Sequence, residues 1–186
     1  MNALVVVANP SRASFSHAMA GVARGALVER EYRILFHDLF AEDFPPVHGG
    51  DALVERHRGE LQAADLVLVF HPNWWGSPPA ILKGWIDRVF CPGVAYEYPP
   101  GVGPAGVPKG LLRARCGLVF NTSETPWERE LAVFGNPLER TWRDGVFAFC
   151  GVERFERAVY GPMSTSTAAM RERWLGEVRS LVEKHA

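Results

Sequence analysis

The sequence predicts a doubly wound α/β domain, in which helices cover both faces of a parallel sheet. Short apolar runs recur along the 186-residue chain, and continuous apolar runs are typical of strands that are buried on both faces. Segments with helical periodicity lie between these runs, so that strands and helices alternate. The length is most simply that of one domain over residues 1–186, large enough to fold without a disulfide or a metal.

The expected strands follow from the apolar runs, which are dominated by valine, leucine and phenylalanine. In chain order they cover residues 3–8, 32–36, 66–70, 116–120 and 155–160. The expected helices, with the candidate caps before them, are 15–27 after Ser14, 52–64 after Asp51, 79–90 after Ser77 and Pro78, 137–149 after Asn136, and 168–184. Residues 91–110 break this rhythm because they are rich in proline and glycine, so we expect an irregular surface excursion there.

Composition excludes several classes of function. The chain carries 20 Lys+Arg against 21 Asp+Glu and has no basic run, so we expect no nucleic-acid partner. Its three cysteines lack Cys-x-x-Cys spacing and form no Cys/His cluster, which predicts reduced thiols and no metal site. The apolar runs are far shorter than the roughly 20 residues of a membrane span, and a strand pattern follows Met1 directly. We therefore expect a cytoplasmic protein without membrane insertion.

Ligands of open parallel sheets bind beyond the carboxyl ends of the strands, where three polar loops are expected. The first loop, residues 9–16, places Asn9, Ser14 and Ser16 before a helix N-terminus, whose free N–H groups favour a phosphate. The alternative is that Ser14 only caps the helix and that Ser11 only makes a turn.

The second loop, residues 71–78, carries adjacent tryptophans, Trp74 and Trp75, followed by Gly76. Adjacent side chains leave an extended chain on opposite sides, so both rings cannot fill one core, and we expect one to face a ligand. Backbone N–H groups over 75–77 are expected to bond the edge of a flat ring. The third loop, residues 121–126, is small and polar. A phosphate site, a flat aromatic site and small polar groups together favour a flavin nucleotide.

The most specific tract is Pro72-x-Trp74-Trp75-x-x-x-Pro79-Ala80-Ile81-Leu82-Lys83-Gly84-Trp85, which continues to Val94-Ala95-Tyr96-Glu97-Tyr98. With Ser14-Phe15-Ser16-x-Ala18, it resembles the flavodoxin-like NAD(P)H:quinone oxidoreductases, including the bacterial modulator of drug activity B type. The resemblance covers most of the chain. It implies a flavodoxin-like α/β fold, a five-stranded parallel sheet in the order 2-1-3-4-5 with helices on both faces.

The resemblance also implies an obligate homodimer with one flavin in each subunit, FAD being favoured and FMN the alternative, and NAD(P)H as the electron donor. The tyrosines Tyr96 and Tyr98 would cover the partner subunit's site and, with Trp75, bind the substrate. The implied cofactor-binding residues are Asn9, Ser14, Phe15 and Ser16 for the phosphates, Asn73, Trp74, Trp75 and Gly76 along the ring, and Asn121, Thr122, Ser123 and Glu124 at its edge and the ribityl chain.

Two departures from the family bear on mechanism. Where animal quinone reductases carry a double glycine, this chain has Ser123 and Glu124, and residues 121–150 contain neither tyrosine nor histidine. The family's Tyr/His proton relay therefore cannot be carried over, and the catalytic residues are unknown. We expect Glu124 to point away from the ring or to cap a helix over 127–134. His71 remains a candidate proton donor at the rim.

We therefore expect a flavin-dependent NAD(P)H oxidoreductase that passes hydride through the flavin to a quinone or a similar flat acceptor. Azo and nitro compounds would bind in the same kind of site and remain possible acceptors. The choice between NADPH and NADH also remains open. The alternatives are a flavodoxin-like electron carrier, which the nearly neutral charge disfavours, and a regulatory flavin-binding subunit without turnover.

Overall fold

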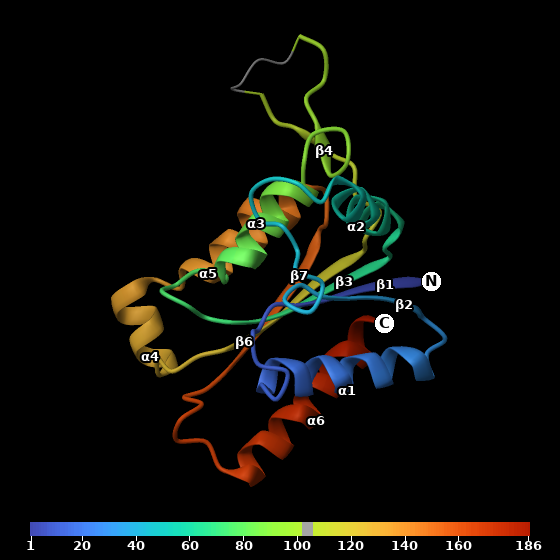
Figure 1. The fold of residues 1–186 in the computed structure, drawn as a ribbon. Coiled ribbons are helices and arrows are strands. Elements are labelled where there is room, and N and C mark those ends of the chain that lie inside the picture. The colour runs from blue at the N-terminus through green and yellow to red at the C-terminus, as the bar shows by residue number, and fades with distance from the viewer. Residues whose placement is uncertain (102–105) are drawn as a thin grey trace.

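The computed structural model describes residues 1–101 and 106–186 and has the predicted α/β architecture. All five strands of the main sheet are parallel, in the order β2-β1-β3-β6-β7, which is the predicted 2-1-3-4-5 order once two short strands, β4 and β5, are set aside (Figure 1). The strands are β1 Asn2–Val7, β2 Arg33–Asp38, β3 Leu66–Pro72, β6 Cys116–Thr122 and β7 Arg154–Tyr160.

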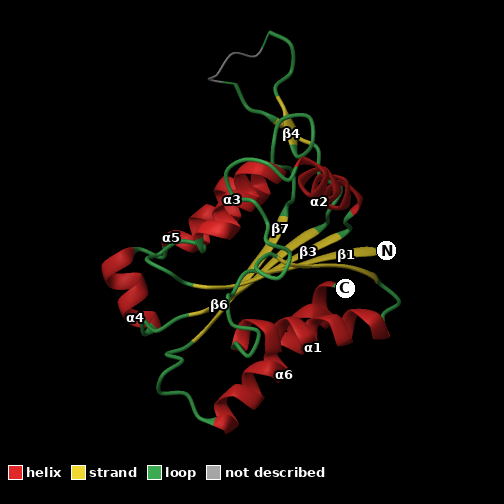
Figure 2. Ribbon diagram, in the orientation of Figure 1, coloured by secondary structure: helices red, strands yellow, loops and turns green. Residues whose placement is uncertain are grey.

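Helices cover both faces of this sheet (Figure 2). On one face, α1 (Phe15–Glu29) and α6 (Ala168–His185) pack against the side chains that β1, β3 and β6 present to that face. The other face carries α2 (Asp51–Ala63), α3 (Ala80–Val89), α5 (Pro137–Arg140) and the π-helical segment η2 (Thr141–Ala148). Between β6 and α5 lie α4 (Trp127–Arg129) and a second π-helical segment, η1 (Glu130–Phe134).

Burial explains which strands the sequence predicted best. Every residue of β3 and β6, the inner strands nearest the site, is buried, so an uninterrupted apolar run is what their positions require. The edge strands β2 and β7 are partly exposed and contain charged residues. No helix of the described residues is long and apolar enough to cross a membrane.

Three local expectations need correction. Helix α2 begins at Asp51 itself, and its N-cap is Gly50, whose left-handed backbone (φ 63°) suits glycine. The predicted helix over 137–149 divides into α5 and η2. Its expected cap, Asn136, makes no capping hydrogen bond, because its side-chain oxygen accepts from Arg157 instead.

The excursion at 91–110 projects from the body of the molecule, as Figure 1 shows. Its base is a short antiparallel ladder of β4 (Tyr96–Glu97) and β5 (Lys109–Gly110), which the sequence did not predict. Gly110 lies so close to the backbone of Gly151 that a side chain there would overlap it. Residues 102–105 lie outside the described residues.

Candidate active site

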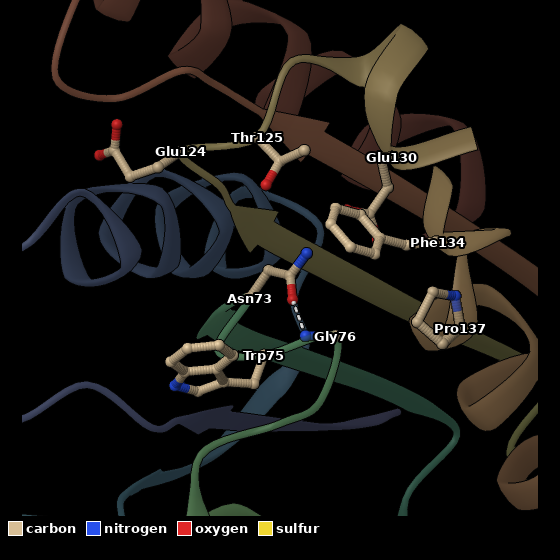
Figure 3. A pocket seen from close by; sticks show the side chains of 8 residues that line it. All are labelled: Asn73, Trp75, Gly76, Glu124, Thr125, Glu130, Phe134 and Pro137. Atoms are coloured by element: carbon tan, nitrogen blue, oxygen red, sulfur yellow. Dashed lines mark hydrogen bonds between the residues drawn. The ribbon is translucent and has the colours of Figure 1, made fainter. Parts of the chain in front are cut away.

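A pocket of about 410 Å³ opens at the carboxyl ends of β3 and β6, which are hydrogen-bonded neighbours in the sheet. The loops after these two strands therefore meet, as the sequence predicted. The wall opposite the tryptophan loop comes from η1 and α5, a contribution that the sequence analysis missed (Figure 3). The lining residues are Asn73, Trp75, Gly76, Glu124, Thr125, Glu130, Phe134 and Pro137.

A tight turn presents the tryptophans. Trp74 and Ser77 exchange two backbone hydrogen bonds of 3.1 and 3.0 Å, and the two residues between them have positive φ, 56° at Trp75 and 69° at Gly76. Positive φ at both central residues is the signature of a type I′ turn, and it strains the tryptophan backbone. The Trp75 side chain is fully exposed and Trp74 is about half exposed, so neither ring belongs to the core.

The backbone amides of this turn are used within it. The Gly76 N–H donates to Asn73 Oδ1 at 3.0 Å, drawn as the dashed line in Figure 3, and the Ser77 N–H donates to Trp74. The expectation that the amides of 75–77 are free to bond a ring is therefore wrong for Gly76 and Ser77. Asn73 acts here by holding the turn that carries Trp75.

In the third loop, the side chains of Ser123 and Glu124 both make hydrogen bonds within the protein. Ser123 Oγ accepts from the Thr125 N–H at 3.1 Å, which fixes the turn after β6. Glu124 Oε2 accepts from the Ser164 hydroxyl at 2.6 Å and from its N–H at 3.1 Å. The Glu124 carboxylate points away from the pocket towards the segment after β7, as one of the two sequence alternatives predicted.

Asn121 does not line the pocket, because β6 continues to Thr122 and leaves Asn121 fully buried beneath the rim. Its Nδ2 donates to His71 Nε2 at 2.9 Å, and its Oδ1 accepts from Arg157 Nε at 2.5 Å. The prediction that its side chain meets the edge of a ring is therefore corrected to a supporting place under the site. Thr122 is also buried, and its carbonyl accepts from the Asn73 N–H at 2.7 Å.

His71 is a neutral structural histidine. Its Nδ1 lies 2.9 Å from the Pro72 carbonyl, which can only accept, while Trp142 Nε1–H donates to its Nε2 at 3.0 Å. Complete burial lowers the pKa of His71 to about 3, and the nearby Arg157 charge acts in the same direction. Because it is buried and both ring nitrogens are occupied, His71 is not the proton donor that the sequence analysis considered.

The first loop lies apart from the lining of this pocket. Ser14 caps α1 by accepting from the His17 N–H, as the alternative interpretation held, and it also bonds the His17 ring, which contacts Asp38 at 3.0 Å. Asn9 Nδ2 lies 3.4 Å from Ser16 Oγ, so these two predicted residues do come together.

Phe15 turns its ring into the core, where it packs edge-on against Tyr160 and Trp174. Only its backbone N–H, with that of Ser16, stands in the first turn of α1, where helix geometry leaves such groups without intrahelical partners.

Arg157 and Glu130 are charged residues near the site that the sequence analysis missed. The Arg157 side chain is fully buried, donates to Asn121 and to Asn136 Oδ1 (2.6 Å), and lies 3.7 Å from Glu139. Burial lowers its pKa, and the Glu139 and Glu130 carboxylates oppose that shift. An arginine inside the apolar run of 155–160 was the available signal, because a buried charge requires partners.

Tyr96 and Tyr98 lie away from Trp75 in their own chain. Tyr96 packs edge-on against Phe149 (4.8 Å) and Tyr98 (6.0 Å between centroids), and Tyr98 is about half exposed. Within one chain, these tyrosines do not contribute to the pocket beside Trp75.

A separate cluster of His37, Glu42 and His57 brings possible metal ligands within 4.8 Å of one another. Trp85 Nε1–H donates to His57 Nδ1 at 2.9 Å, so His57 Nε2 carries the hydrogen and faces Glu42 at 3.2 Å. Burial tends to raise the pKa of Glu42, but the two histidines outweigh it and lower that pKa to about 2. With the hydrogen bond between His37 Nδ1 and Glu42 Oε1 (3.0 Å), this forms a histidine–carboxylate network under α2 and α3, in which the contact of His57 Nε2 with Glu42 is an ion-pair distance and not a hydrogen bond.

Comparison with known proteins identifies the family of the chain. Residues 1–181 match the family model described as having a flavodoxin-like fold. An uncharacterized NAD(P)H oxidoreductase of Haemophilus influenzae is 30% identical over 87% of this chain and 84% of its own length. A ribosyldihydronicotinamide dehydrogenase [quinone] of Pongo abelii is 30% identical over 80% of this chain and 76% of its own.

Among solved structures, the NAD(P)H:quinone oxidoreductase of Methanothermobacter marburgensis superposes with a TM-score of 0.82. The match covers 99% of this chain and 96% of that one, at 23% identity, which supports the fold. The family model, which matches nearly the whole chain, and the two relatives at 30% identity assign the chain to a family as well as to a fold. The chain belongs to the flavodoxin-like family of NAD(P)H:quinone oxidoreductases.

Proposed function

We propose that this protein is a flavin-dependent oxidoreductase that takes hydride from NAD(P)H and delivers it, through a bound flavin, to a quinone or a similar flat acceptor. The observation that carries the proposal is the Trp75 ring, fully exposed on a strained turn at the mouth of the pocket. A large apolar ring that is exposed to solvent on a strained backbone favours a flat ligand that stacks on the ring.

The residues around the pocket fit flat rings, a flavin and an acceptor stacked on it. Trp75 offers an aromatic face, Thr125 offers a small hydroxyl, and Phe134 and Pro137 form an apolar wall across from Trp75 (Figure 3). The first turn of α1 presents the N–H groups of Phe15 and Ser16 beside a positive dipole end, which fits a phosphate. When bound, the flavin would supply the hydride acceptor and donor.

The chain's own contribution is to bind, orient and exclude water. Trp75, held by the Asn73–Gly76 hydrogen bond, positions a flat substrate by stacking, and the apolar wall keeps water from its face. His71 and Asn121 support the turn and the β6 loop from below. The proposal places no nucleophile among the side chains, because the hydride step needs none.

FAD is the proposed flavin, with FMN as the alternative, on the resemblance of the 72–98 tract and of the Ser14–Ser16 region to the quinone reductases. The donor stays NAD(P)H, because no residue in the pocket marks a 2′-phosphate site. The three cysteines are unpaired, and burial raises the pKa of Cys116 and Cys150 to about 11 and about 12, so both are unreactive thiols. Unpaired thiols support a cytoplasmic setting for this activity.

We also propose that the working form is a homodimer in which Tyr96 and Tyr98 cover the partner subunit's pocket. Large apolar side chains are exposed in the tryptophan turn, in the excursion and along α4 and η1, and a second subunit could cover them. These residues are Trp74, Trp75, Tyr98, Val107, Trp127, Leu131, Val133 and Phe134. Light scattering on the purified protein tests the dimer, since a monomer at micromolar concentration would contradict it.

An assay of NADPH oxidation with menadione, after incubation of the protein with FAD or FMN, tests the proposed activity. Turnover that depends on both flavin and menadione supports the oxidoreductase. A protein that binds flavin without oxidising NADPH or NADH would instead be an electron carrier or a regulatory subunit.

A further inference from the structure

The pocket contains one acidic side chain whose position the proposed reaction does not explain. Glu130 is 3% exposed, at the start of η1, and its side chain lines the pocket beside Phe134. Among the described residues, its Oε1 has no hydrogen-bond partner. Figure 3 shows Glu130 and Phe134 on one wall, across from Asn73 and Trp75.

An unpartnered buried carboxyl oxygen is costly unless a ligand supplies the missing donor. The other acidic residue of the pocket, Glu124, is exposed and already bound by Ser164, so it offers no such site. The buried cation Arg157 donates through Nε and Nη1 to Asn121 and Asn136, and Nη1 lies 3.7 Å from Glu139, while its Nη2 also has no hydrogen-bond partner among the described residues. Its charge acts on Glu130 without a direct ion pair, which makes a carboxyl group in this wall tolerable, and Glu130 Oε1 still has no donor among the described residues.

We propose that Glu130 is a specificity-determining residue that accepts a hydrogen bond from an N–H or O–H donor on the edge of a flat, neutral aromatic acceptor. This inference rests on the proposed function, whose substrate class it narrows. The apolar surfaces of Phe134 and Pro137 select a flat ring, and Glu130 selects a ring that carries a donor. Anionic rings are disfavoured by the same carboxyl group.

Two naphthoquinones of nearly equal size separate these effects, because 2-amino-1,4-naphthoquinone has a donor where menadione has a methyl group. Isothermal titration of each oxidised quinone into the FAD-loaded protein, without NADPH, gives the ratio of their dissociation constants. The wild type should bind the amino compound more tightly, and Glu130→Leu should lower that preference about tenfold or more. Glu130→Gln, which keeps a neutral acceptor of the same size, should fall between them.

Glu128→Leu is the matched control, because Glu128 is an exposed carboxylate on the preceding turn and should leave the ratio unchanged. A Glu130→Leu protein with the wild-type ratio would overturn the proposal. So would a variant that loses FAD affinity but keeps the ratio, since the donor would then belong to the flavin. The titration needs no turnover, so a protein that fails to oxidise NADPH but shows the Glu130-dependent preference refutes the proposed function alone.

Discussion

Acid should weaken the folded protein through His71, whose ring is fully buried and whose pKa is lowered to about 3. Burial is the main cause, since it penalises the charged ring. In the unfolded chain a histidine titrates near its ordinary pKa of about 6.5. As the pH falls below that value, the unfolded chain takes up a proton that the folded chain does not. Stability contributed by neutral His71 is therefore lost between about pH 6.5 and about pH 3.

Linkage gives the size of this effect. At about pH 4.5 the histidine is protonated in the unfolded chain and neutral in the folded one. Because this pH lies about two units below the pKa in the unfolded chain, the free energy of unfolding falls by roughly 2.7 kcal/mol from its value at neutral pH. The perturbation is His71→Gln, whose amide oxygen can still accept from Asn121 and Trp142 but does not titrate. It should cost about 1 kcal/mol at neutral pH, through the lost hydrogen bond to Pro72.

Urea unfolding at about pH 7.5 and about pH 4.5, followed by circular dichroism, measures the loss for each protein. His71→Gln should lose roughly 2–3 kcal/mol less on acidification than the wild type. His48→Gln is the control, since His48 is exposed and its replacement should leave the acid loss at the wild-type value. Equal acid losses in His71→Gln and the wild type would refute the assignment of His71 as a buried neutral residue.

Three further outcomes test the packing and the assembly. Gly84→Ala should lower the free energy of unfolding by about 1–3 kcal/mol, because the new Cβ would lie 2.5 Å from the Pro46 backbone. In thermal melts, Gly21→Ala, with open space around it, should instead stabilise by up to about 1 kcal/mol. Randomly mixed dimers of Trp75→Ala and Tyr98→Ala subunits should recover about a quarter of wild-type turnover, because half are heterodimers with one intact site. No recovery would place both residues in one chain's site.

The sheet could be predicted from the sequence because its inner strands are buried on both faces. The exposure of a tryptophan in the second loop was also predicted, since Trp74 and Trp75 are adjacent and cannot share one core, but the tight turn that exposes both rings was not. Asn121 was misplaced because β6 continues two residues beyond the apolar run, which carries this polar side chain into a buried network with His71. No local pattern marks that extension, since it depends on pairing with β3.

The wall of the pocket made by η1 and α5 lay beyond sequence reasoning. A helix over 127–134 was expected only as the element that Glu124 could cap, and this segment divides into α4 and the π-helical η1. Glu130 is buried in this segment, but in the sequence it is one of several neighbouring acidic residues and nothing marks it as buried. The covering role of Tyr96 and Tyr98 needs a second copy of the chain and stays a prediction.

One measurement tests the central proposal most directly. The purified protein, incubated with FAD or FMN and freed of excess flavin, is examined by visible absorption while NADPH is added without oxygen. We expect a bound flavin band that NADPH bleaches and that menadione restores. A protein that stays colourless after both incubations would contradict the flavin-dependent activity, and its family membership would then account for the fold alone.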